Sequence, residues 1–79
     1  MPIAEVFDRI RAALNASPRN AYVAELHLQV IKYAEFLGDI TGREFCAALG
    51  IGPSFGAEFT KMRKIAARLE AAGLDVDRL

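Results

Sequence analysis

The stretch Gly42–Met62, GREFCAALGIGPSFGAEFTKM, constrains the fold more than any other part of the sequence. Two segments with apolar residues at helical spacing meet at Gly50, with almost no linker between them. Because glycine adopts positive φ without steric cost, Gly50 can end one helix and turn the chain sharply into the next. Two steeply crossing helices also need small residues where they touch, and residues 46–48, with Gly56 opposite, supply them. The sequence therefore predicts two helices clamped at a steep angle.

Four helices are predicted in total. The first runs over residues 2–15, and the second begins after an N-cap at Asn20 and closes at Gly38. The third starts with the capping-box pattern T-G-R-E at Thr41 and ends at Leu49. The fourth begins at Gly52-Pro53-Ser54, with Gly52 or Ser54 as its N-cap, and ends at Gly73. Since no strand-like alternation occurs, the predicted fold is all-α, a compact bundle of about four helices in a single domain, residues 1–79.

Each helix carries an apolar stripe that we expect to face the core. The stripes are Ile3, Val6, Phe7, Ile10 and Leu14; Val23, Leu26, Val30, Ala34 and Leu37, edged by Tyr22 and Tyr33; Phe45 and Leu49; and Phe55, Phe59, Met62, Ala66 and Leu69, flanked by Ile65. The second helix has another stripe, Ala24, Leu28 and Ile31, about 100–140° away. A helix that is apolar on more than one side is wrapped by its own domain or shared with a partner, and in so small a protein we expect the second stripe to form a homodimer interface.

Charge gives a weaker indication. The chain has ten basic and ten acidic residues and no net charge, so composition alone does not favour nucleic-acid binding. Basic residues nevertheless concentrate in the last predicted helix, where Lys61, Lys64 and Arg68 recur at i, i+3 and i+7 on the face away from the predicted core. Such a stripe is either an ordinary solvated face or a set of phosphate contacts. Arg63 falls nearer the core edge, seven residues before Glu70, which is a possible partner.

The glycine joint resembles that of phage-repressor-type helix-turn-helix domains. Those motifs place a small residue four positions before the turn glycine, an apolar residue directly after it and another nine positions after it, and Cys46, Ile51 and Phe59 hold these places. The pattern departs at Gly56, where the family has Val or Ile, which predicts that the last helix starts late or is rotated. The whole chain also resembles small bacterial proteins described as helix-turn-helix-like.

The resemblance implies a transcription regulator that docks its third and fourth helices on duplex DNA. It implies groove-facing places for Ser54, Glu58 and Lys61 and a backbone contact for Arg43, while Lys64 and Arg68 extend the basic stripe toward phosphates. A homodimer would join two weak half-sites.

The alternative is a helical protein–protein interaction module, an adaptor or an inhibitor of a larger partner such as a transcription factor. It would use the second stripe of the second helix or the outer face of the fourth. The zero net charge and the few side chains able to read bases favour it. A related possibility is contact with RNA polymerase or another DNA-bound protein.

Other chemistry is sparse. His27, the only histidine, is expected to be a partly buried structural residue, and Cys46, the only cysteine, a small core residue. A lone cysteine allows no internal disulfide, and together with the lack of a signal-peptide pattern it makes the bacterial cytoplasm the expected location. No apolar run approaches the roughly 20 residues of a membrane helix. We expect no membrane contact, no metal, no cofactor and no enzymatic activity.

Overall fold

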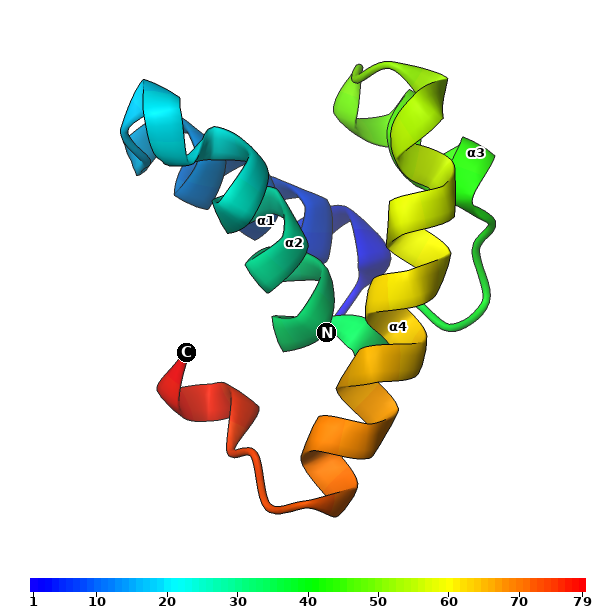
Figure 1. Cartoon of the computed structure of the whole chain (residues 1–79). Coiled ribbons are helices and arrows are strands. Elements are labelled where there is room, and N and C mark those ends of the chain that lie inside the picture. Colours follow the sequence, from blue (N-terminus) through cyan, green and yellow to red (C-terminus); the bar gives the residue numbers. More distant parts are fainter.

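Four α-helices, joined by short 3₁₀ turns, make up the computed structural model, which describes all 79 residues (Figure 1). The α-helices are α1 (Ile3–Ala16), α2 (Tyr22–Lys32), α3 (Gly42–Leu49) and α4 (Gly56–Ala71). The 3₁₀ turns are η1 (Arg19–Ala21), η2 (Ala34–Phe36), η3 (Pro53–Phe55) and η4 (Val76–Arg78). No strand is present, and the prediction of an all-α bundle containing a helix-turn-helix is confirmed.

The core is centred on Phe45 of α3, which is fully buried. Its ring stacks on that of Phe59 of α4, with centroids 4.4 Å apart, and lies 5.8 Å from the ring of Phe7 of α1. Burying a side chain of this size stabilises the fold by about 1.5–3 kcal/mol. The full core cluster draws on all four helices: Val6, Phe7, Ile10, Leu14, Leu26, Val30, Tyr33, Leu37, Phe45 and Phe59.

The predicted apolar stripes are buried at their centres and exposed at their ends. Val23, in the first turn of α2, is 61% exposed, and Leu69, in the last turns of α4, is 39% exposed, so their predicted burial is wrong. Figure 1 shows why for α4, whose C-terminal half extends past the ends of α2 and α3. Tyr33, predicted at the edge of its stripe, is buried in the core. Helical spacing identifies a face, but how far neighbouring helices cover that face depends on the fold.

The second helix is shorter than predicted. It ends at Lys32, and Tyr33 leaves helical geometry with φ −106° and ψ 17° before the chain continues as η2. Just after η2, Arg63 of α4 ties this part of the chain down, because its Nη1 donates to Leu37 O at 3.0 Å and to Gly38 O at 3.1 Å. Gly38 therefore does not cap the helix, and its φ is not positive. The possible pairing of Arg63 with Glu70 is not formed, since the guanidinium donates to the Leu37 and Gly38 carbonyls.

Two predicted N-caps are wrong as well. Asn20 lies inside η1, and the N-cap of α2 is Ala21, which has no side-chain capping bond. Of the two alternatives for the last helix, Ser54 lies inside η3, whereas Gly52 is the N-cap of η3, with Pro53 in its first turn, and α4 itself begins only at Gly56. The late start of the last helix, expected from the glycine at that position, is confirmed.

The joint between α3 and α4 is built as predicted at both ends of α3. Thr41 and Glu44 form a reciprocal capping box, with Thr41 N donating to Glu44 Oε1 at 2.9 Å and Glu44 N to Thr41 Oγ1 at 3.1 Å. At the other end Gly50 has φ 69°. The N–H groups of Gly50 and Ile51 donate to the carbonyls of Ala47 and Cys46 at 3.2 and 3.0 Å. This pair of bonds is a Schellman motif, which satisfies the last carbonyls of the helix.

The small residues predicted at the crossing of α3 and α4 are confirmed only in part. Cys46 is buried and Gly56 lies at the crossing, whereas Ala47 and Ala48 are exposed, and the residue of α3 that contacts Gly56 is Gly42. A Cβ on Gly42 would lie 2.6 Å from the Gly56 carbonyl oxygen, so the two backbones touch. Figure 1 shows α3 crossing behind the start of α4 rather than continuing it.

Candidate nucleic-acid interface

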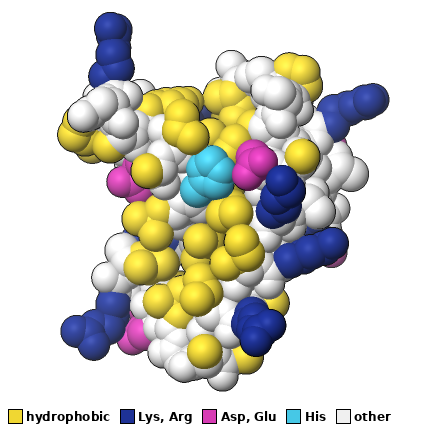
Figure 2. Space-filling view, viewed as in Figure 1, with side chains coloured by type: hydrophobic (Ala, Val, Ile, Leu, Met, Phe, Trp, Pro, Cys, Tyr) yellow, Lys and Arg dark blue, Asp and Glu magenta, His cyan; other side chains and the backbone are white.

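The basic stripe of α4 lies on the outer face of the helix. Phe59 and Ala66 of the same helix are fully buried, which fixes the orientation of α4 and leaves Lys61, Lys64 and Arg68 exposed. Figure 2 shows Lys and Arg side chains following the length of α4 on one face of the molecule. Lys64 and Arg68 take part in none of the ion pairs or side-chain hydrogen bonds of the chain, so their charges are available to a ligand.

Glu58 is engaged inside the protein. Its Oε2 lies 3.4 Å from His27 Nε2, and its Oε1 lies 3.4 Å from Lys61 Nζ. The hydrogen bond from His27 and then that from Lys61 lower the pKa of Glu58 below its ordinary value. Both carboxylate oxygens therefore already have partners, and the side chain is half-buried. Lys61 remains 65% exposed despite this contact.

His27 joins α2 to the first turn of α4. Its Nδ1 lies 2.7 Å from the carbonyl oxygen of Val23, its Nε2 faces Glu58, and the Phe55 ring meets it edge-on at 5.1 Å. Since a carbonyl and a carboxylate both only accept hydrogen bonds, both contacts are hydrogen bonds only when both ring nitrogens carry a proton. The side chain is 25% exposed, and the expectation of a partly buried structural histidine is confirmed. The histidine is the cyan side chain near the centre of Figure 2.

Arg43 and Ser54 lie near the joint. Both are exposed, Arg43 in the first turn of α3 and Ser54 in η3 just before α4. Arg43 directly follows Gly42, whose contact with Gly56 places it beside the start of α4. Lys64 and Arg68 lie about two and three turns further along that helix. The predicted site residues thus extend from the joint along α4, with Glu58 turned toward His27.

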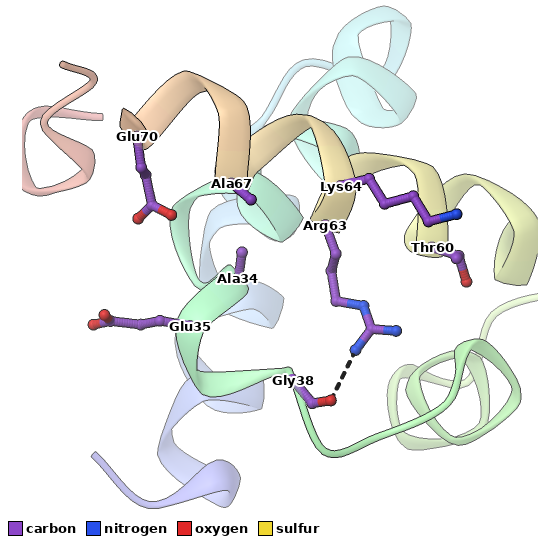
Figure 3. Close-up of a pocket in the computed structure, with 8 residues that line it drawn as sticks. All are labelled: Ala34, Glu35, Gly38, Thr60, Arg63, Lys64, Ala67 and Glu70. Atoms are coloured by element: carbon purple, nitrogen blue, oxygen red, sulfur yellow. Dashed lines mark hydrogen bonds between the residues drawn. The ribbon is translucent and has the colours of Figure 1, made fainter. Parts of the chain in front are cut away.

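Arg63 has a role that the sequence did not reveal. It lines a groove of about 420 Å³ between η2 and α4, together with Ala34, Glu35, Gly38, Thr60, Lys64, Ala67 and Glu70 (Figure 3). Its guanidinium points across this groove to Gly38 and lies over the Phe59 ring at 4.6 Å. The Nε atom is buried without a hydrogen-bond partner. Arg63 therefore links η2 to α4 across this groove, a role that its predicted place at the core edge did not indicate.

The surface beside the basic stripe is apolar. Ala24 and Leu28 of the predicted dimer stripe are exposed and Ile31 is half-buried, so the chain's own core leaves this stripe largely uncovered. On α4, Ile65 is 44% and Leu69 39% exposed. The helices α2 and α4 pack against each other, and Figure 2 shows hydrophobic side chains between them.

Candidate chemical groups elsewhere are few. Cys46 is buried, and desolvation raises the pKa of its thiol, which confirms its place as a small core residue. The structure contains no group of three or more His, Cys, Asp or Glu side chains placed to hold a metal ion. None of the helices combines the length and the apolar character needed to cross a membrane.

The fold and the site together define a small helical domain of the helix-turn-helix class. The glycine-capped α3, the turn through η3 and the exposed cations of α4 are the features that carry this assignment. The chain belongs to the family described as an HTH-like domain, whose sequence pattern matches residues 2–72. At a coarse level, membership points to nucleic-acid binding and a regulatory role. No curated protein and no solved structure matches the chain significantly.

Proposed function

We propose that this chain is a transcription regulator of the phage-repressor helix-turn-helix type that docks α3 and α4 on duplex DNA as a homodimer, without enzymatic activity, in a bacterial cytoplasm. The observation that carries the proposal is the stripe of Lys61, Lys64 and Arg68, exposed on α4, the last helix of an HTH-like domain. Duplex DNA supplies closely spaced phosphates along its backbone, and cations one to two helical turns apart can each meet one.

Phosphate contacts carry most of the expected affinity. Each neutralised phosphate changes the logarithm of affinity by about 0.9 per decade of salt, so three contacts in each half of a dimer give a steep dependence. Base readout has fewer candidates. Ser54 is exposed near the joint, whereas both carboxylate oxygens of Glu58 contact His27 and Lys61. We therefore expect Glu58 to support the shape of the interface more than to read cytosine.

Dimerisation through Ala24, Leu28 and Ile31 would complete the site. One copy offers three stripe cations and few base contacts, and two joined copies would double both. The stripe on α2 contains no charged residue, so two copies could meet there without electrostatic repulsion. A partner subunit would also stabilise so short a chain by burying additional apolar surface.

Gel-shift titration against random duplex DNA tests the proposal. We expect the triple variant K61A/K64A/R68A to lose at least about 100-fold in affinity at low salt, because three charge-assisted contacts vanish together. A matched control, R9A/R19A/R78A, removes the same charge from exposed positions off α4 and should bind like the parent. Equal binding by both triple variants, with helical circular dichroism intact, would exclude the proposed docking face.

The second candidate function is the protein–protein interaction module. The exposed Leu28, Ile65 and Leu69 favour it, because duplex DNA offers little apolar surface to cover them. If the parent fails to bind DNA at low salt, this function takes precedence.

A further inference from the structure

An apolar groove with a basic edge lies on the outer side of α4. It has a volume of about 390 Å³ and is lined by Lys64, Ile65, Arg68, Leu69 and Ala72. The walls combine two exposed aliphatic side chains with two cations that have no ion-pair partner in the chain. The same lysine and arginine belong to the proposed DNA-binding stripe, so whatever fills this groove also contacts that stripe.

Charge and apolar character together select the occupant. Phosphates would neutralise Lys64 and Arg68 but leave Ile65 and Leu69 in water. A second copy of the chain would cover the aliphatic side chains, but a two-fold contact uses the same patch on both subunits and would bring four unpaired cations around one interface. A protein helix with aliphatic residues on one side and carboxylates along the edge satisfies both features.

We propose that this groove binds an acidic amphipathic helix of another protein, and that the bound helix displaces DNA from α4. Aliphatic side chains at i, i+3 or i+4 and i+7 of the partner would pack on Ile65 and Leu69. Flanking Glu or Asp residues would pair with Lys64 and Arg68. The displacement rests on the proposed function, whereas the binding of the helix does not. DNA and partner exclude each other because both need the same two cations.

Designed peptides of about 18 residues, five helical turns, provide the probe. The test peptide has Leu at i, i+3, i+4 and i+7 positions and Glu elsewhere. One control has Lys in place of every Glu, and a second has the acidic composition in scrambled order without an apolar face. Fluorescence anisotropy with the full-length protein should detect binding of the acidic amphipathic peptide. We expect its affinity to be at least about tenfold higher than that of either control, and to fall at least about tenfold when the salt concentration rises from about 0.05 to about 0.5 M. Changes of about this size are what a pair of exposed charge contacts gives.

Variants locate the binding surface. I65S/L69S and, separately, K64E/R68E should each lose at least about tenfold in peptide affinity, one through the apolar walls and the other through charge. Controls of the same chemistry elsewhere are I3S, at an aliphatic residue that is 42% exposed on α1, and R19E, at an exposed arginine of η1. All six substituted residues are solvent-exposed, and circular dichroism verifies that the four variants fold.

The outcomes separate the two proposals. Peptide binding that is lost in both groove variants supports the groove whether or not DNA binds, and competition between peptide and labelled DNA supports the displacement. Equal binding of all three peptides, or unchanged binding by I65S/L69S, would overturn the proposal. A third result would also overturn it: the acidic peptide does not bind, and the parent chain self-associates in a way that I65S/L69S abolishes. A second copy of the chain would then be the occupant of the groove. Loss of DNA binding alone would concern only the proposed function.

Discussion

Gly42 and Gly56 bring the backbones of α3 and α4 into direct contact, and the contact is unequal. A Cβ on Gly42 would lie 2.6 Å from the Gly56 oxygen and 2.8 Å from its Cα, whereas a Cβ on Gly56 would lie 3.5 Å from the nearest Gly42 atom. The first geometry requires the two helices to move apart, while the second is an ordinary van der Waals contact. The crossing that positions α4 therefore depends mainly on the absence of a side chain at Gly42.

We predict opposite effects for alanine at these two positions. Gly42→Ala should destabilise the fold by about 1–3 kcal/mol, as overpacking against backbone does. Gly56→Ala should be neutral or stabilising by up to about 1 kcal/mol, because alanine favours the helix at a position with φ −55° and ψ −39°. Urea unfolding measures both. An equal loss of stability in the two variants would contradict the unequal contact.

Arg63 should contribute to stability through η2 and not through Glu70. Arg63→Met keeps the aliphatic stem over Phe59 but removes the donors to the Leu37 and Gly38 carbonyls, so we expect a loss of about 1–3 kcal/mol. Glu70→Gln should leave the free energy of unfolding within about 0.5 kcal/mol of the parent. Thermal unfolding of the two variants decides between the partners. A larger loss of stability in Glu70→Gln than in Arg63→Met would favour Glu70 as the partner of Arg63.

How far the sequence determined these features depends on the range of the interactions involved. The capping box at Thr41 and the positive φ of Gly50 follow from contacts within a few residues, so local patterns predicted them. The hydrogen bond from Arg63 to the Leu37 carbonyl joins residues 26 positions apart, and no local pattern contains that information. Similarly, the backbone contact between Gly42 and Gly56 can be seen only once α3 and α4 are placed together. The basic stripe was predictable because its spacing belongs to one helix, whereas the engagement of Glu58 by His27 depends on how α2 packs against α4.

The pair formed by Glu58 and His27 should make stability depend on pH at the acidic end. Because the folded protein lowers the pKa of Glu58, ionised Glu58 stabilises the fold above the ordinary glutamate pKa of about 4.3. That contribution is lost as pH falls through the lower folded value, when the carboxylate takes up a proton. Carboxyl titration by NMR should show a pKa of Glu58 below the ordinary glutamate value, and His27→Ala should move that pKa upward. An unchanged Glu58 pKa in His27→Ala would mean that Lys61 alone holds it down.

Leu28 tests whether the α2 stripe joins two copies. It is 37% exposed at the middle of Ala24, Leu28 and Ile31, and Leu28→Glu would place a charge where a two-fold contact brings the same residue of both copies close together. We expect this variant to sediment as a monomer at concentrations where the parent is a dimer, and to bind DNA at least about tenfold more weakly, because each copy would then hold only one half-site. Val23→Glu is the matched control, since Val23 is 61% exposed on the same helix but outside the stripe, and it should leave both measurements unchanged. The parent chain could instead be monomeric at every concentration tested and still bind DNA with the expected salt dependence. That result would contradict the dimer, and the stripe on α4 would then be the whole of the interface.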